Sequence, residues 1–480
     1  MDDKDPIEEA RKFRGGILIV TDRYPPNAHG GAELSLHIML SGLDNKADIV
    51  VLTFNESTST PRFYELDGVN VVEFPYPVDW PYHQHSIAEF EKLQARPRGI
   101  RGLSKLWWLA EYCLAADPRS VTRRLRMLYQ RFLVGVRGGV PADFEQFDNS
   151  LRRRMVQSIV AAMQPRLIHA DNYRSMLTVA SLAEETDARL VGLVRDNRFY
   201  CMTPSQSMMV NGKVCGACDF ECYDARQKNI VTVKELLGLN RAYRQAALRK
   251  FDRVVVTSEF LQTQISSIVD PARIAKVANP ADSPELVYQA ARGIAELPGF
   301  NILVVGMLNE NKGQMDIVQN LDKLVAAIPD AHVYFAGRGE RIEKRIHEVA
   351  QEKGFPDRVE VLGYLGRDEL YQWMRRCQVV GLPTLWPEPF GRVPLEAGLS
   401  ARPVVAYRIG GLKETILHER TGLLVEHQDM DGFIAALKRL ADDPGLGRRM
   451  GYAAYETIPR LYQAEQQAGQ IGQIWKELAV

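Results

Sequence analysis

Short apolar runs recur along the chain, with helical segments between them. Early examples lie at 16–21 (GILIVT), 49–54, 166–170 and 189–194. A strand that is apolar along its whole length is buried on both faces, which is typical of a parallel sheet with helices on both sides. The chain has 480 residues, which is too long for one ordinary hydrophobic core. The sequence therefore predicts an α/β fold with two domains.

The composition limits the class of protein. Hydrophobic residues make up 46% and charged residues 25% of the chain, as in soluble globular proteins. The 60 basic and 60 acidic residues cancel, which argues against a nucleic-acid partner. No apolar run approaches the ~18 residues that a membrane helix needs. The charged start, MDDKDPIEEARKFR, has no apolar signal core, so we expect a cytoplasmic protein whose residues 1–13 form a mobile tail.

A polar segment divides the chain. Residues 281–299 contain Pro284 and Pro298 and are interpreted as a linker. They would separate an acceptor-side domain at 1–280 from a second domain at 300–480. Strands of the second domain are predicted at 300–305, 331–336, 359–362, 379–382 and 403–407. The last helix is expected to pack back on the first domain.

Two glutamates in the second domain stand eight residues apart. Glu388 precedes the tight turn Pro389-Phe390-Gly391, and Glu396 lies in a predicted helix from Arg392 to Leu399. We expect both carboxylates to face one cleft. Backbone N–H groups at a helix start attract phosphate, and a carboxylate accepts hydrogen bonds from sugar hydroxyls. The simpler alternative is a surface glutamate and an unrelated helix glutamate, because charged residues are mostly solvated.

Further features follow in a fixed order, namely the Gly410-Gly411 loop and the run TGLLV at 421–425. This whole stretch resembles the donor-binding motif of family 4 retaining glycosyltransferases of the GT-B fold, in which two glutamates flank seven residues. The resemblance implies two Rossmann-like doubly wound domains that face a cleft. It also implies transfer of a sugar from a nucleotide-sugar to an acceptor, with retention of the anomeric configuration. The acceptor would be a glycan, a lipid-linked molecule or a small molecule, as in polysaccharide, glycolipid or other glycoconjugate synthesis.

The resemblance assigns roles to residues of the second domain. Glu396 would hold the ribose hydroxyls and Glu388 the transferred sugar, beside the donor-binding residues Phe390, Gly391 and Arg392. Lys312, in the segment GMLNENKGQ, matches the lysine that neutralises the departing diphosphate. The family often has a basic residue where Met307 stands, which leaves Lys312 with more of this task. No catalytic Mg²⁺ is expected.

Two segments of the first domain match the family less closely. The loop PPNAHGGAE follows the first strand and is not a GxGxxG fingerprint. By resemblance, Gly30 and Gly31 would let the backbone approach the donor diphosphate. Arg195 and Asp196 follow a later strand at a place where the family usually has His-Asp, and Asp196 is kept as a catalytic candidate. Two other functions remain open, a GT-B nucleotide-sugar epimerase or hydrolase and a non-catalytic, metal-dependent binding or sensor protein.

Four cysteines lie close together within an insert at about 199–238. They are Cys201, Cys215, Cys218 and Cys222. Four thiolates at such spacings can hold a zinc ion, with an iron–sulfur cluster as the second choice. The alternatives are reduced thiols in a loop, or a redox pair at Cys215 and Cys218.

A helical insertion is predicted at about 85–160, and it is strongly basic. Between Lys92 and Arg154 there are fourteen basic and five acidic residues, a balance of +9. Basic helices with interleaved aromatic residues suit an anionic membrane surface or a phosphorylated acceptor. This would place the protein in the cytoplasm or peripherally on the inner face of the membrane. The alternative is an insertion whose aromatic residues fill a small core of its own.

Overall fold

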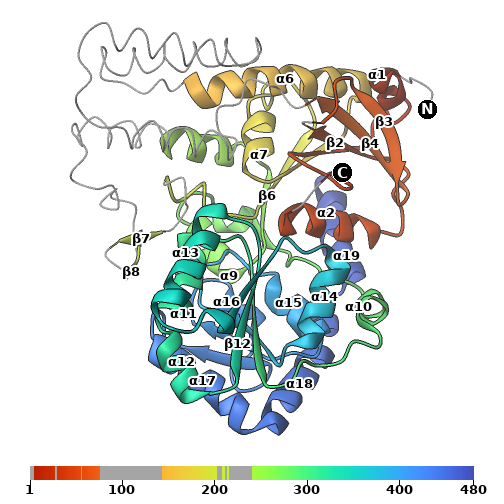
Figure 1. Ribbon diagram of the computed structural model, residues 1–480. Helices are drawn as coiled ribbons and strands as arrows, with labels where there is room; N and C mark the ends of the chain where they lie inside the picture. The colour runs from red at the N-terminus through yellow and green to blue at the C-terminus, as the bar shows by residue number, and fades with distance from the viewer. Residues whose placement is uncertain are drawn as a thin grey trace, which may run out of the picture.

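The computed structural model describes residues 5–27, 30–55, 57–75, 143–202, 208–210, 213–215 and 241–479. These residues form two parallel-sheet units, one above the other in Figure 1. We call residues up to 280 together with the last helix the first unit, and residues 281–463 the second unit. The predicted α/β class is confirmed.

The first unit is built on an eight-stranded sheet with the order β10-β9-β6-β5-β1-β2-β4-β3. All neighbouring strands are parallel except β3 and β4, which are antiparallel. The edge strand β3 was not predicted, because its exposed face interrupts the apolar pattern. The strands are β1 (Ile17–Thr21), β2 (Ile49–Asn55), β3 (Arg62–Leu66), β4 (Val69–Pro75), β5 (Leu167–Asp171), β6 (Arg189–Val194), β9 (Arg253–Val256) and β10 (Ile274–Lys276).

Helices cover both faces of this sheet. They are α1 (Pro6–Arg11), α2 (Gly31–Ser41), α6 (Asp143–Met163), α7 (Tyr173–Ala180), α9 (Glu259–Ile265), the 3₁₀ helix η1 (Pro271–Arg273) and the helical residues 241–249. A separate hairpin pairs β7 (Met209–Val210) with β8 (Lys213–Val214). Most of the predicted insertion at 85–160 lies outside the described residues, and α6 is its described part.

The two faces of β1 explain the apolar runs. Leu18 and Val20 pack with α1, α6 and α7 on one face, while Ile17 and Ile19 pack with α2 and the last helix on the other. Because successive side chains of a strand point to opposite faces, a strand covered on both sides must be apolar at every position. The parallel pairing and the continuous runs therefore have one cause.

The expectation of a mobile N-terminal tail is wrong for residues 6–11. They form α1, whose first turn is capped by a hydrogen bond from Ile7 N to Asp5 Oδ1 of 2.9 Å. Pro6 and Ala10 are buried, and α1 packs against α6. Proline suits the first turn of a helix because its missing N–H has no partner there in any case. Burial of a few apolar side chains thus orders a segment that is rich in charged residues.

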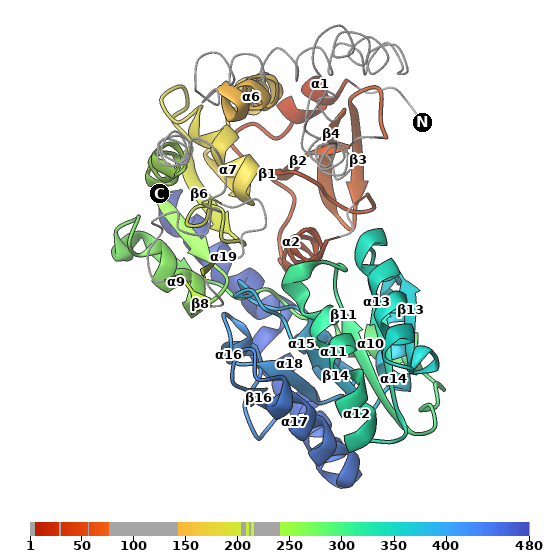
Figure 2. The ribbon, with the colours of Figure 1, turned by 60° about the vertical axis from the view of Figure 1, so that its left-hand side comes forward.

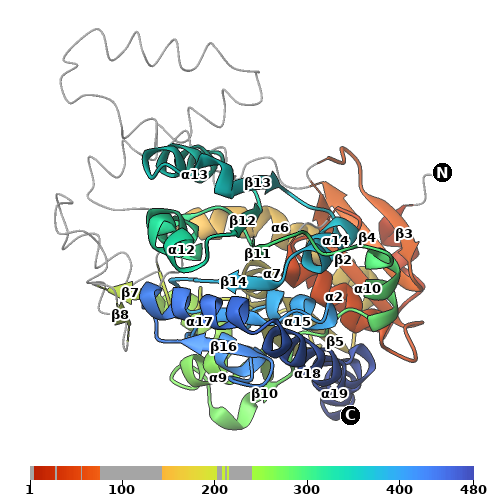
Figure 3. The same cartoon turned by 60° about the horizontal axis from the view of Figure 1, so that its bottom comes forward.

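The second unit is a six-stranded, fully parallel sheet with the order β13-β12-β11-β14-β15-β16. Figure 3 labels β13, β12, β11, β14 and β16 of this sheet. Five of the strands lie where the sequence predicts them, namely β11 (Phe300–Val305), β12 (Ala331–Ala336), β13 (Val359–Gly363), β14 (Val379–Leu382) and β15 (Val404–Tyr407). The sixth, β16 (Gly422–Val425), was not predicted as a strand. This is the order of a Rossmann fold.

Helices surround this second sheet, and their apolar residues join one continuous core. They are α10 (Pro284–Ala291), η2 (Glu310–Lys312), α11 (Gln314–Gln319), α12 (Leu321–Ala327), α13 (Glu340–Glu352), η3 (Pro356–Arg358), α14 (Arg367–Arg376), α15 (Val393–Leu399), α16 (Leu412–Thr415), α17 (Met430–Asp442) and α18 (Pro444–Tyr462). Within the expected linker at 281–299, α10 packs on α14 and contributes Val287 and Ala291 to the core. In the described ranges, no helix is both long and apolar enough to cross a membrane.

The last helix, α19 (Ala464–Leu478), returns to the first unit (Figure 2). Ile471 and Trp475 pack into the core of the first unit beside α2. Trp475 Nε1 donates a hydrogen bond of 3.2 Å to Nδ1 of His169, in the middle of β5. The chain thus crosses between the units twice, after Asn279 and after Tyr462.

The buried His169 should make the stability of the first unit depend on pH. Burial, with a smaller contribution from Arg195, lowers the pKa of His169 to about 3, against about 6.5 in an unfolded chain. The unfolded chain therefore binds more protons between these values, so the contribution of His169 to stability is complete above pH ~6.5 and is lost as the pH falls toward 3. The expected slope reaches about 1.4 kcal/mol per pH unit.

The measurement is the free energy of unfolding in urea from pH 7 to pH 4, for the wild-type chain and for His169→Gln. Glutamine keeps a hydrogen-bonding side chain but does not titrate. The difference between the two proteins should shrink as the pH falls. A difference that stays constant over this range would contradict the prediction.

Candidate functional site

The order of the second sheet reverses between β11 and β14. In open parallel sheets, ligands bind at the carboxyl ends of strands beside such a reversal. Two loops leave the sheet there, the lysine loop (residues 306–313) and the glutamate loop (residues 383–391). In the first sheet, the reversal lies between β1 and β5, and the loop at 22–30 begins there. The predicted site residues Gly30, Lys312 and Glu388 therefore all lie on loops at these strand ends.

Lys312 and Glu388 meet across the two loops. Lys312 Nζ donates a hydrogen bond to Glu388 Oε1, and Trp386 Nε1 donates to the same oxygen at 3.1 Å. The ammonium also lies 5.2 Å from the centroid of the Trp386 ring. The two charged side chains are 22% and 15% exposed, so they are reachable by a ligand but largely shielded from water. Charges in such a place act on a ligand more strongly than they would in water.

Backbone contacts fix the distance between the lysine and glutamate loops. Leu385 N donates to Asn311 O at 2.8 Å, and Thr384 Oγ1 donates to the same oxygen at 3.1 Å. Gly313 has a φ of +69°, and a Cβ there would lie 1.9 Å from Pro383 O. A glycine is therefore required where the two loops cross. This crossing places Lys312 next to Glu388.

The Gly410-Gly411 pair packs against the backbone of the glutamate loop. Gly411 N donates to Glu388 O at 2.7 Å, and a Cβ on Gly410 would lie 2.4 Å from that same oxygen. Phe390 is buried against Tyr462, with ring centroids 5.7 Å apart. Gly391 has a φ of +88° and lies against Leu412. Phe390 and the glycines therefore shape the loop that carries Glu388.

Glu396 and Arg392 form a buried ion pair. Arg392 Nε donates to Glu396 Oε1 at 2.9 Å, and the two side chains are 9% and 12% exposed. Burial raises the pKa of Glu396, and the neighbouring Arg392 opposes this rise. Arg392 Nη2 also donates to Asp282 Oδ2 at 2.9 Å. The predicted donor residue Arg392 is thus engaged with two carboxylates of its own chain.

Asp282 is the more deeply buried of these carboxylates, with 1% of its side chain exposed. It accepts hydrogen bonds from Arg392, Arg367 and the Tyr371 hydroxyl. Burial acts to raise the pKa of Asp282, but Arg392 and Arg367 outweigh it and hold the pKa below its usual value. Asp282 therefore stays charged and neutralises two arginines beside the predicted site.

First-unit residues border the glutamate loop. Asn197 Nδ2 donates to Pro387 O at 3.2 Å, and Ser258 Oγ donates to Pro389 O. Glu414 of the second unit accepts from the first backbone N–H groups of α9, Glu259 N at 2.8 Å and Phe260 N at 3.1 Å. The carboxyl edges of the two sheets therefore face each other across direct hydrogen bonds.

Asp196 lies one residue before Asn197, beside this border. Its Oδ1 accepts from Arg198 N at 2.9 Å, and its side chain is 22% exposed. The preceding Arg195 is buried, and its Nε donates to Asp171 Oδ1 at 2.6 Å. Arg195 Nη1 donates to Asn279 Oδ1 at the crossover between the units. Arg195 thus links strand β5 of the first sheet to the crossover.

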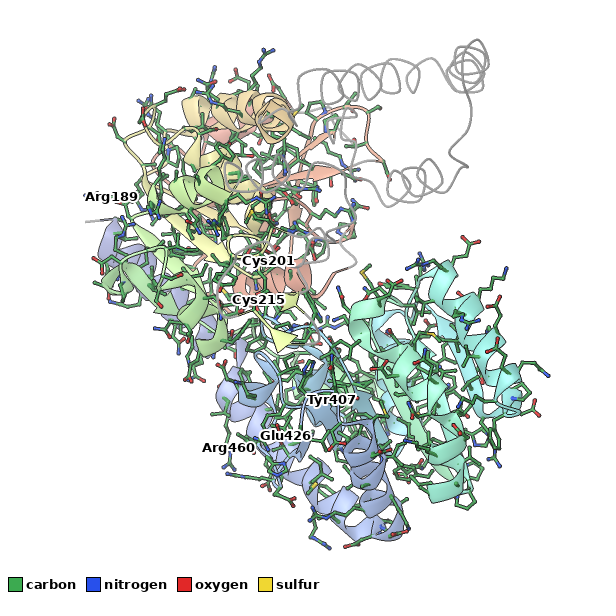
Figure 4. All side chains as sticks on the ribbon, turned by 90° about the vertical axis from the view of Figure 1, so that its left-hand side faces the viewer. Arg189, Cys201, Cys215, Tyr407, Glu426 and Arg460 are labelled. Carbon is green, nitrogen blue, oxygen red and sulfur yellow. The ribbon has the colours of Figure 1, made fainter. Side chains whose placement is uncertain are left out.

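The cysteine cluster is only partly within the described residues. Cys201 is buried and Cys215 is half-buried, and Figure 4 shows both on the part of the first unit that borders the second. Cys218 and Cys222 lie outside the described ranges. Among the residues that the structure does describe, no group of three or more His, Cys, Asp or Glu side chains could hold a metal ion.

The second unit matches a known protein family. Residues 295–457 match the family model described as glycosyl transferases group 1. The second unit is a glycosyl transferases group 1 domain. The glycogen synthase of Mycobacterium tuberculosis (strain CDC 1551 / Oshkosh) is 30% identical over 221 residues, which are 44% of this chain and 50% of that protein. The chain spans about half the length of the curated relatives it matches.

Solved structures match over nearly the whole chain. The sucrose-phosphate synthase from Thermosynechococcus elongatus has a TM-score of 0.67 at 18% identity and covers 97% of this chain and 99% of its own. The Anabaena protein HepE in complex with UDP-glucose has a TM-score of 0.59 at 17% identity and covers 96% and 99%. At such identities the likeness shows the fold alone. The fold is GT-B, as predicted.

Several residues that hydrogen-bond to the glutamate loop or to Arg392 were not predicted as site residues from the sequence. They are Ser35, Asn197, Ser258, Asp282 and Trp386. Trp386 could have been found, because it stands two residues before Glu388. The other four are polar residues in loops or helices, and no spacing rule marks them. Their importance comes from contacts with segments that are far away in the sequence.

Proposed function

We propose that this protein is a glycosyltransferase that transfers a sugar from a nucleotide-sugar to an acceptor, with retention of the anomeric configuration. The observation that carries the proposal is the contact between Lys312 and Glu388 at the carboxyl ends of β11 and β14. It combines a cation for a leaving diphosphate with a carboxylate for sugar hydroxyls, inside a glycosyl transferases group 1 domain.

The chemistry follows from the leaving group. The bond between the anomeric carbon and a phosphate oxygen breaks, and its electron pair leaves on the diphosphate. The acceptor oxygen bonds to the anomeric carbon, and the proton of the acceptor hydroxyl passes to the departing diphosphate. Negative charge grows on the diphosphate as it leaves, so a fixed cation stabilises the transition state more than the ground state. Lys312 supplies that cation. Glu388 would orient the sugar, Glu396 would hold the ribose, and Asp196 would face the acceptor side.

We propose a uridine diphosphate sugar as the donor. Support comes from two structural neighbours whose bound ligands are named, HepE with UDP-glucose and a trehalose-6-phosphate protein of E. coli with UDP-2-fluoro glucose. The acceptor would be a glycan, a lipid-linked molecule or a small molecule.

The test is a thermal-shift panel of UDP-, GDP- and ADP-sugars, followed by product analysis. A ligand at a hundred times its Kd stabilises the folded state by about 2.7 kcal/mol, which is readily measured. We expect UDP-sugars to raise the Tm and Glu396→Ala to abolish that rise. New glycoside should appear only when an acceptor is present. Consumption of the donor without an acceptor would favour an epimerase or hydrolase, and no shift with any nucleotide-sugar would contradict the proposal.

We also propose that Cys201, Cys215, Cys218 and Cys222 bind a zinc ion, with an iron–sulfur cluster as the alternative. Cys215 follows β8 directly and its N donates to Met208 O at 2.7 Å, while Cys201 N donates to Asn197 O at 2.6 Å. A metal there would anchor the insert beside Asn197, on the acceptor side. About one zinc per chain is expected. Cys218→Ser should lose the metal and expose the insert to protease, and Cys377→Ala, which changes a cysteine of the second unit, should keep it. A protein purified without air that contains no metal would refute this proposal.

For the basic segment from Lys92 to Arg154, we propose contact with an anionic membrane surface or a lipid-linked acceptor. The +9 balance supports this, because such a field attracts anionic lipid over about a Debye length, ~8 Å in physiological salt. Co-sedimentation with anionic vesicles should weaken as salt rises. Equal binding to neutral vesicles would argue against it.

A further inference from the structure

The guanidinium of Arg392 is shared among four acceptors, on Ser35, Pro280, Asp282 and Glu396. Nε donates to Glu396 Oε1 at 2.9 Å, and Nη2 donates to Asp282 Oδ2 at 2.9 Å. Nη1 donates to Pro280 O at 3.0 Å and to Ser35 Oγ at 3.2 Å. The side chain is 9% exposed. Arg392 therefore connects several segments of the chain inside the molecule, and we call this set of contacts the junction.

The contact with Ser35 crosses from the second unit to the first. Ser35 lies in α2, is fully buried, and donates its own hydroxyl hydrogen to Gly31 O at 2.6 Å. Its oxygen remains able to accept the hydrogen bond from Arg392, because a hydroxyl has one donor and two acceptor positions. A continuous line of hydrogen bonds thus runs from the Gly31 carbonyl through Ser35 and Arg392 to Glu396.

Gly31 makes room for this junction. A Cβ on Gly31 would lie 3.1 Å from Cδ of Arg392, which is closer than ordinary van der Waals contact. The bare backbone of Gly31 therefore lets the aliphatic part of Arg392 pack against the start of α2. Gly31 and Arg392, predicted separately as donor-site residues on two domains, touch each other.

Only an arginine can make this set of contacts. Its planar guanidinium presents five N–H donors in fixed directions, whereas the lysine ammonium is a single point charge on a flexible stem. Four of those five N–H groups would be used by the four acceptors. The carboxylates of Asp282 and Glu396 keep the cation paired, since a buried unpaired charge is very unfavourable.

We propose that Arg392 is a positioning residue that couples closure of the first unit over the cleft to the orientation of Glu396. When α2 approaches, Ser35 takes up one hydrogen bond of the guanidinium and fixes its rotation, and the guanidinium in turn holds the Glu396 carboxylate. The role of Glu396 in holding the donor rests on the proposed function. The contact between Arg392 and Ser35 does not rest on it, because that contact is a hydrogen bond between two residues of this chain.

The test compares Ser35→Ala with Ser35→Thr and Ser158→Ala. The first removes the hydrogen bond between Ser35 and Arg392 and leaves Arg392 paired with both carboxylates, so folding is preserved. Threonine restores the hydroxyl. Ser158 is a matched control, because it also bonds a backbone oxygen within a helix of the first unit, Met155 O at 2.7 Å, far from the second unit in the chain.

The first readout is the radius of gyration of the ligand-free protein, measured by small-angle X-ray scattering. Ser35→Ala and Arg392→Lys should be more open than the wild type, whereas Ser35→Thr and Ser158→Ala should match it. The second readout is kinetic. We expect kcat/KM for the nucleotide-sugar to fall about tenfold in Ser35→Ala, with threonine restoring it. Binding of UDP should weaken in the same variant, because UDP carries the ribose that Glu396 would hold.

The two readouts separate the possible failures. If Ser35→Ala has a larger radius of gyration but no variant transfers sugar, the role of Ser35 and Arg392 in closure is supported and the proposed function is rejected. Ser35→Ala with the radius of gyration and kinetics of Ser158→Ala would overturn the coupling, whatever the enzyme does. Equal losses in Ser35→Ala and Ser35→Thr would also overturn it, because the effect would then come from packing and not from the hydroxyl.

Discussion

Replacing Lys312 by alanine is expected to lower kcat for sugar transfer roughly 10- to 100-fold, with a smaller effect on KM. Loss of a hydrogen bond to a charged group costs on the order of 1.5 to 3 kcal/mol, and each 1.4 kcal/mol is a factor of ten. The effect falls on kcat because the diphosphate carries more unshared charge as it leaves than in the bound donor. Steady-state kinetics with saturating acceptor measures it.

Two comparisons make this result specific. Lys323→Ala removes an exposed lysine of the same unit that is paired with Asp431 at 2.7 Å, and it should leave kcat unchanged. Glu396→Ala should instead raise KM for the donor, since hydrogen bonds to the ribose are made equally in the ground state and the transition state. Unchanged kcat in Lys312→Ala would remove Lys312 from the site.

Replacing Asp282 by alanine is expected to destabilise the second unit by about 3 to 5 kcal/mol, the usual loss when one partner of a buried ion pair is removed. Asp282 accepts hydrogen bonds from Arg392, Arg367 and Tyr371. Its removal leaves the guanidinium of Arg392 with one carboxylate and takes away the carboxylate to which Arg367 donates. For a unit of this size the Tm should fall by roughly 6 to 20 °C.

The matched control is Asp431→Ala. Asp431 is also paired with a cation, but its side chain is 75% exposed, and exposed ion pairs contribute little. Thermal unfolding of both variants, followed by circular dichroism, gives the comparison. Equal Tm values for Asp282→Ala and Asp431→Ala would show that burial of the ion pair is not what makes Asp282 important.

Much of the fold follows from local patterns. The parallel strands β1, β11 and β14 are buried on both faces, so they are visible as apolar runs without any knowledge of their neighbours. The short helix α1 was missed, although Asp5 and Pro6 form a recognisable start signal. Charged residues on its exposed face obscured the two that are buried. The edge strand β3 was missed because only one side of it is covered.

The residues of the lysine loop and the glutamate loop could also be predicted from the sequence, because they stand close together along the chain. Glu388, Phe390, Gly391 and Glu396 fall within nine residues, and the lysine loop has its own glycines. What the sequence alone determined is therefore the α/β architecture and the residues on each loop. Local backbone conformation depends on residues that are close in the sequence, and these are known from the sequence itself.

Only the tertiary structure decided which of these residues meet. Lys312 and Glu388 are 76 residues apart, Arg392 and Asp282 are 110 apart, and Arg392 and Ser35 are 357 apart. Polar side chains at such separations follow no period, because their pairing depends on where two sheets present their carboxyl edges to each other. Burial then gives these pairs their strength, since the same charges in water would interact weakly. The contacts of Arg392 with Ser35, Pro280 and Asp282, which the sequence did not predict, have this origin.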